Sequence, residues 1–86
     1  MIIEKLPTYI NEFIITKRKE RRIGQSMLGM KAGVSLQTVW NYENCSSNRL
    51  HMSTFVKLVY AMDLTLSDFE SWIEERDKKI TLTRSI

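Results

Sequence analysis

Hydrophobic residues recur along most of this chain at intervals of three and four, the spacing of an α-helix with one buried face. In the first such stretch the stripe consists of Ile10, Phe13 and Ile14. Pro7 suits the first turn of that helix, because its missing N–H donor is tolerated there. Residues 1–6 form an apolar arm without a clear period. The complete pattern predicts five helices, over about residues 7–21, 25–32, 36–43, 52–62 and 65–79.

The last two predicted helices carry the clearest stripes. The inward positions of the fourth helix are expected to be Met52, Phe55, Val59 and Met62. Thr65 and Asp68 predict a reciprocal cap at the start of the fifth helix. The chain has one Pro and three Gly among its 86 residues, which also favours helices over turn-rich β structure. We therefore predict an all-α fold, with one domain over residues 1–79.

Residues 25–42 predict two short helices joined by a sharp turn. Five apolar residues have the spacing that closes two inner helix faces against each other: Leu28, Ala32, Val34, Val39 and Tyr42. Gly29 stands where the helices would approach most closely. Gly33 stands where a left-handed backbone is usually needed. Ser35 is a suitable side-chain cap for the second of these helices.

The chain resembles the Cro and phage-repressor (XRE) family of DNA-binding domains. The positions that carry the resemblance are Gln25, Leu28, Gly29, Ala32, Gly33, Val34, Ser35, Thr38, Val39, Tyr42, Glu43 and Asn44. Residues 55–69 are similar to the last two helices of that family, so the resemblance covers about residues 10–73. It implies a five-helix lambda-repressor-like domain in which helices 2 and 3 form a helix-turn-helix that binds double-stranded DNA.

The third helix is predicted to divide into an inward face, with Val39 and Tyr42, and an outward face. The residues expected to contact bases are Leu36, Gln37, Thr38 and Asn41. The amides of Gln37 and Asn41 have the donor and acceptor needed for adenine in the major groove. Leu36 cannot hydrogen-bond to a base, but it can pack on a thymine methyl group.

A second group of residues is expected to contact the DNA backbone. Its members are Gln25, Ser35, Trp40, Asn44, Ser47 and Arg49. The resemblance implies that Gln25 contacts a phosphate, and the helix N-terminus adds partial positive charge there. Trp40 leaves two interpretations open, since it lies either along the sugar–phosphate backbone or against another part of the protein.

The resemblance also implies an ion pair between Arg18 and Glu43, which would tie the first helix to the third. The alternative is two separate surface charges. Other cations are unevenly distributed: residues 1–50 hold eight Lys/Arg and four Asp/Glu, whereas residues 51–86 hold five and six. A basic half beside the predicted DNA-contacting helix favours phosphate binding.

Several classes of protein are disfavoured by composition. One cysteine, Cys45, excludes an internal disulfide, and one Cys with one His makes a metal site improbable. No nucleophile–base pair is evident, so we expect no enzyme activity, no cofactor and no small-molecule site. No apolar run is long enough to span a bilayer and no signal peptide is visible, so we expect no membrane association and a cytoplasmic protein.

The C-terminal part is expected to form a homodimer. Three residues of the fifth helix divide between the core and a dimer contact: Phe69, Trp72 and Ile73. Residues 80–86 alternate apolar and polar positions, and a short strand there could pair through Ile80 and Leu82 with a second copy. The alternative is an unstructured tail.

Together these features predict a sequence-specific transcriptional regulator, in the first place a repressor that binds a palindromic operator as a homodimer. One alternative is the antitoxin of a toxin–antitoxin pair, which would also bind a toxin. Another is the controller protein of a restriction–modification system. The neighbouring gene would separate these classes, because it would encode a toxin, a methyltransferase or a phage early protein.

Overall fold

The computed structural model describes residues 2–44 and 51–76 and contains five α-helices in this part of the chain. They are α1 (Ile2–Glu20), α2 (Gln25–Ala32), α3 (Leu36–Asn44), α4 (Met52–Ala61) and α5 (Leu66–Arg76). No strand occurs within these ranges. The all-α prediction is therefore confirmed for the described residues. The predicted C-terminal strand lies outside them.

The centre of the core is a cluster of three aromatic rings from three helices. Phe13 of α1 lies 5.0 Å from Phe69 of α5, and Phe69 lies 4.8 Å from Phe55 of α4, measured between ring centroids. Both pairs meet edge to face, the arrangement that aromatic quadrupoles favour. Further residues complete the core around these rings: Tyr9, Ile10, Ile14, Leu28, Val39, Tyr42, Leu58, Val59, Met62 and Ile73.

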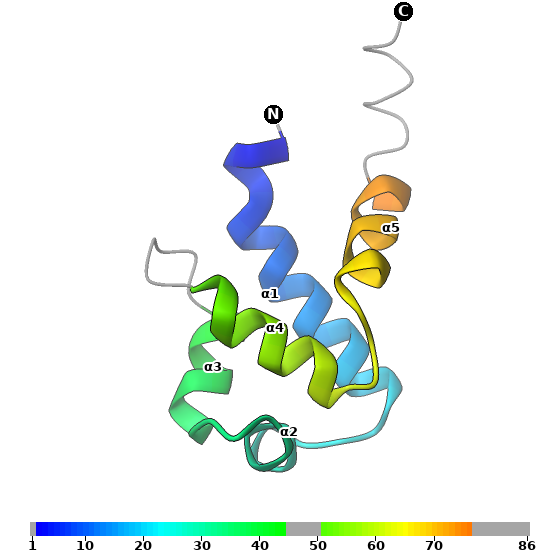
Figure 1. Cartoon of the computed structure of the whole chain (residues 1–86). Coiled ribbons are helices and arrows are strands. Elements are labelled where there is room, and N and C mark those ends of the chain that lie inside the picture. The colour runs from blue at the N-terminus through cyan, green and yellow to red at the C-terminus, as the bar shows by residue number, and fades with distance from the viewer. Residues whose placement is uncertain (1, 45–50, 77–86) are drawn as a thin grey trace, which may run out of the picture.

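Helices α2 and α3 lie at one end of the molecule, and α5 lies at the other (Figure 1). α1 packs against α3 and α5, while α2 packs against α3 and α4. In the view of Figure 1, α2 and α3 lie at the bottom, and α5 and the first turns of α1 lie at the top. This arrangement leaves α2 and α3 together at one end, away from α5.

The first helix begins earlier than the sequence predicted. α1 starts at Ile2, so residues 2–6 belong to a helix rather than to an irregular arm, and Pro7 lies inside it. A proline at this position cannot donate the hydrogen bond that an N–H would have made to the carbonyl of Ile3. Pro7 is the sixth residue of α1, so this bond would be among the first to follow the four N–H groups that have no helical acceptor. One lost bond near the end is therefore compatible with the longer helix.

The prediction that Met52 belongs to the core is wrong. Met52 is the first residue of α4 and is 58% exposed. The buried stripe of this helix is instead Phe55, Leu58, Val59 and Met62, which follows the i, i+3, i+4, i+7 pattern. Leu58 was not among the predicted core residues of this helix. Met52 lies one turn before that stripe, where the helix begins and little of the chain covers it.

The predicted cap of α5 is present. Asp68 N–H donates to Thr65 Oγ1 over 3.3 Å, and Thr65 N–H donates to Asp68 Oδ2 over 2.7 Å.

A hydrogen bond that was not predicted from the sequence joins the ends of α1 and α4. Arg21 Nε donates to the carbonyl of Met62 over 2.6 Å. A cation at the last carbonyls of a helix also interacts favourably with its dipole.

Candidate nucleic-acid interface

The connection between α2 and α3 is a tight turn centred on Gly33. Gly33 has φ 74°, in the left-handed region, and its N–H donates to the carbonyl of Met30. The N–H of Val34 donates to the carbonyl of Gly29 over 2.9 Å. These two bonds form a Schellman motif, which ends α2 and satisfies two of its last carbonyls. The prediction of a left-handed glycine at residue 33 is confirmed.

Close approach of the turn to α2 explains the glycine at residue 29. A Cβ atom there would lie 2.9 Å from the carbonyl oxygen of Val34 and 3.4 Å from Cγ2 of Val39. The first distance is shorter than any ordinary contact and involves backbone, which cannot move aside without shifting the turn. Gly29 therefore fixes how closely α3 packs on α2.

The start of α3 is held by the predicted cap. Thr38 N–H donates to Ser35 Oγ over 3.1 Å, and the two hydroxyl groups lie 2.9 Å apart. Beyond this cap the helix divides as expected, since Val39 and Tyr42 are buried. Leu36, Gln37 and Trp40 are exposed on the other side.

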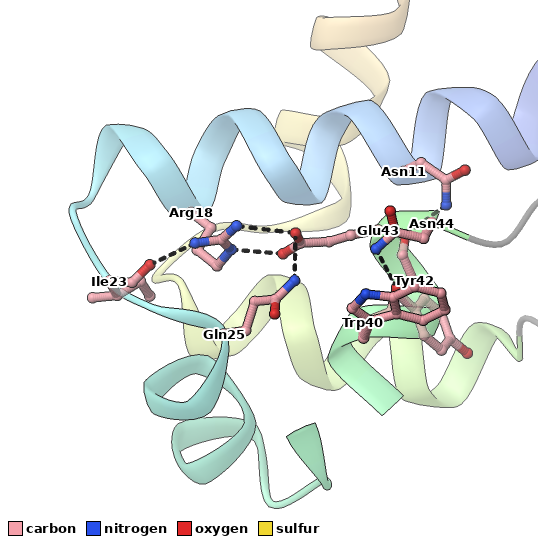
Figure 2. Close-up of polar contacts among 8 residues, drawn as sticks. All are labelled: Asn11, Arg18, Ile23, Gln25, Trp40, Tyr42, Glu43 and Asn44. Atoms are coloured by element: carbon pink, nitrogen blue, oxygen red, sulfur yellow. Dashed lines mark hydrogen bonds and ion pairs between the residues drawn. The ribbon is translucent and has the colours of Figure 1, made fainter. Parts of the chain in front are cut away.

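Arg18, Gln25 and Glu43 form a polar cluster that joins three helices (Figure 2). Arg18 donates from Nε to Glu43 Oε2 over 2.6 Å and from Nη2 to Glu43 Oε1 over 3.0 Å. Arg18 Nη1 also donates to the carbonyl of Ile23 over 3.0 Å. The side chains of Arg18 and Glu43 are 14% and 3% exposed, so the predicted ion pair is confirmed and shielded from solvent.

Gln25 completes this cluster in a way the sequence analysis did not predict. Its Nε2 donates to Glu43 Oε1 over 3.0 Å, and Figure 2 shows its amide pointing at that carboxylate. Gln25 is therefore a structural partner of Glu43 in this chain, and at least one of its N–H groups is already used. Its predicted contact with a phosphate would have to use the rest of the amide or the backbone N–H at the start of α2.

The end of α3 is anchored to α1 and to the start of α4. Asn11 Nδ2 donates to the carbonyl of Tyr42 over 2.6 Å. The hydroxyl of Tyr42 donates to the carbonyl of His51 over 2.8 Å and accepts the His51 N–H over 2.6 Å. With its first turn held by Ser35, α3 is fixed at both ends.

The outward face of α3 borders an open hollow. It is lined by Gln25, Leu36, Gln37 and Trp40, so the structure brings together predicted base and backbone contacts. Gln37 Nε2 also donates to Asn41 Oδ1 over 3.0 Å. This bond was not predicted from the sequence, although an amide pair at i and i+4 is a recognisable signal for it.

The remaining predicted DNA contacts are distributed as follows. Asn44 is exposed and its Nδ2 donates to the carbonyl of Trp40 over 2.9 Å, one turn back in the same helix. Thr38 is partly exposed, and its hydroxyl lies within hydrogen-bonding distance of Ser35. Ser47 and Arg49 lie outside the described residues.

The structure divides the three predicted dimer residues of α5 unequally. Phe69 and Ile73 are 8% and 9% exposed in the single chain, because they pack into its core and leave little surface for a second copy. Trp72 is half-buried, with its ring 5.6 Å from Phe13 and 6.1 Å from Tyr9. Of the three, only Trp72 retains substantial exposed surface. Ile80 and Leu82 lie outside the described residues.

Two arginines at the end of α1 make their hydrogen bonds within the fold. Arg18 pairs with Glu43, and Arg21 donates to Met62. Lys19 and Arg22 are exposed, as is Lys31 of α2.

No group of three His, Cys, Asp or Glu side chains is placed to hold a metal ion within residues 2–44 and 51–76. None of the helices in these ranges is both long and apolar enough to cross a bilayer.

No model of a protein family, no curated protein and no solved structure matches the chain.

Proposed function

We propose that this protein is a sequence-specific DNA-binding regulator in which α2 and α3 act as a helix-turn-helix and α3 enters the major groove. The observation that carries the proposal is the outward face of α3. It presents Gln37 and Asn41, joined by a hydrogen bond, beside exposed Leu36 and Trp40, on a helix fixed at both ends. Amide groups held rigidly on one helix face suit contacts with base edges.

Charge supports the same proposal. The chain has a net charge of +3, and its excess of Lys and Arg lies in residues 1–50, which include α1, α2 and α3. Exposed Lys19, Arg22 and Lys31 add to this basic half. Phosphate neutralisation by such cations provides affinity, and contacts to base edges provide specificity.

A two-fold dimer would place two copies of α3 about one DNA turn apart, on the two halves of a palindromic operator. Occupation of such a site at a promoter would block transcription, so we propose a repressor. The location of α5 at the end opposite α2 and α3 leaves it available for the dimer contact (Figure 1).

Selection from a pool of random DNA duplexes with the full-length protein tests this proposal. The expected result is enrichment of one short, two-fold symmetric sequence, bound with an affinity that falls as salt rises. The Gln37→Ala variant serves as the specificity control and should select a relaxed sequence. A pool that shows no enrichment with the native chain would overturn the proposal.

A further inference from the structure

Two apolar side chains on the outward face of α3 have no role in the core. Leu36 is 51% exposed and Trp40 is 46% exposed. They are four residues apart, so they lie on the same side of the helix, one turn from each other. The polar side chain of Gln37 follows Leu36 on that face, and all three line the same hollow together with Gln25. Two of the four lining side chains are therefore apolar, and the other two carry amide groups.

This combination matches one kind of base-pair edge. In the major groove, adenine presents an acceptor and a donor that suit a carboxamide, and its partner thymine presents the C5-methyl group. Thymine is the only one of the four standard bases with an apolar group in that groove. A face that alternates amides with exposed apolar side chains therefore complements A·T and T·A pairs better than G·C pairs.

The spacing of the two apolar residues agrees with contacts to different base pairs. Leu36 and Trp40 are separated by about 6 Å along the helix axis, since each residue rises about 1.5 Å. Successive base pairs are about 3.4 Å apart. A helix lying along the groove would thus bring the two side chains to positions nearly two base pairs apart.

We infer that Leu36 and Trp40 determine specificity by packing on thymine methyl groups of the operator half-site. The inference rests on the proposed function, because it requires α3 to enter the major groove. It assigns Trp40 to a base edge, rather than to the sugar–phosphate backbone or to another part of the protein. A protein partner covering the same two side chains would be indifferent to the methyl content of the DNA.

Replacement of thymine by uracil tests this directly, because it removes only the methyl group. The probe is the duplex enriched from the random pool, with each thymine of one half-site changed singly. Affinity is expected to fall roughly three- to tenfold at one or two positions, as burial of a methyl group predicts. In Leu36→Ala or Trp40→Ala, one of those positions should lose its sensitivity to uracil. The matched control is Tyr60→Ala, an exposed aromatic residue of α4 that does not line the hollow.

The outcomes separate the inference from the proposed function. Unchanged affinity after every single uracil replacement, on a duplex that is still bound specifically, would overturn the inference and leave the proposed function standing. Equal losses by Trp40→Ala and Leu36→Ala on thymine and uracil duplexes would also overturn it, because the contact would then not involve the methyl groups. Failure of the native chain to select any duplex would overturn both.

Discussion

Gln25 Nε2 donates a hydrogen bond to Glu43 Oε1 over 3.0 Å, so the first residue of α2 contacts the carboxylate that also accepts two N–H groups of Arg18. Glu43 therefore links α1, α2 and α3 through one buried side chain. Because burial removes water from the Glu43 carboxylate, its negative charge is stabilised by these three N–H donors instead.

Loss of either partner of this ion pair is expected to destabilise the fold. Arg18→Ala or Glu43→Ala should lower the free energy of unfolding by up to roughly 3–5 kcal/mol, and Glu43→Ala by somewhat less, because the Arg18 guanidinium that it leaves unpaired keeps some solvent contact. Chemical denaturation of both single variants and of the double variant measures the coupling. The double variant should lose much less than the sum of the two, and additive losses would contradict the pair.

Gly29→Ala is expected to destabilise the packing of α2 on α3. The added Cβ would meet the Val34 carbonyl at 2.9 Å, and overpacking of this kind costs roughly 1–3 kcal/mol. Gly24→Ser provides the matched control at the other end of α2, where a Cβ meets nothing within 4 Å and φ is −79°. Because serine can cap the helix, Gly24→Ser should stabilise by a few tenths of a kcal/mol. Thermal melts that rank the two variants in the opposite order would contradict this account.

Gln37→Ala and Asn41→Ala are expected to reduce discrimination at one base pair of the half-site, by roughly 1–3 kcal/mol each, without unfolding the protein. Their shared hydrogen bond adds a condition: each variant frees the other amide, so the double variant should show non-additive losses. Binding titrations against single-base-pair changes of the operator give the measurement. Uniform weakening with an unchanged base preference would remove both residues from the set of base contacts.

Gln25→Ala and Arg49→Ala are expected to weaken binding to all sequences by similar factors. Arg49→Ala should also flatten the dependence of log K on log salt by about one ion. Gln25→Ala should in addition reduce stability, because Glu43 loses one of its donors. Titrations at several salt concentrations, together with thermal melts, separate the two variants. A change in base preference for either one would contradict the assignment to the DNA backbone.

The full chain is expected to sediment as a dimer at tens of micromolar. Since Phe69 and Ile73 are buried in the single chain, the apolar α5 surface left for such a contact comes from Trp72, which is half-buried, and from Leu66, which is 39% exposed. A chain ending at Lys79 should remain dimeric if this surface makes the contact, and should become monomeric if residues 80–86 make it. A monomeric full chain would contradict the dimer.

Local chemistry in the sequence was sufficient to predict the turn at Gly33 and the caps of α3 and α5. Gly33 and the reciprocal Thr65–Asp68 cap depend on residues close in the chain, where one conformation is strongly favoured. The same is true of the inward positions of α3. Arg18 and Glu43 are far apart in sequence, and their pairing was predicted from a resemblance rather than from spacing.

Other features depend on contacts between distant parts of the chain, or on which turns of a helix remain exposed to solvent. The Arg21 bond to the Met62 carbonyl joins the ends of α1 and α4, and no local pattern marks it. Met52 has helical spacing to the core stripe, but periodicity does not reveal that the first turn of α4 is exposed. The Gln37–Asn41 bond was available from sequence, since both residues occupy neighbouring positions on one helix face.

The double hydrogen bond between the Tyr42 hydroxyl and the backbone of His51 has a consequence for engineering. Tyr42 is 4% exposed, and its two bonds define where the chain must return before α4 begins, whatever the intervening residues are. The entropic cost of lengthening a closed loop grows only slowly with its length. An insertion between Asn44 and His51 is therefore expected to cost little stability, although it would interrupt the segment that carries the predicted DNA contacts Ser47 and Arg49. An inserted segment there would leave the spacing of α3 and α4 unchanged as long as Tyr42 is retained.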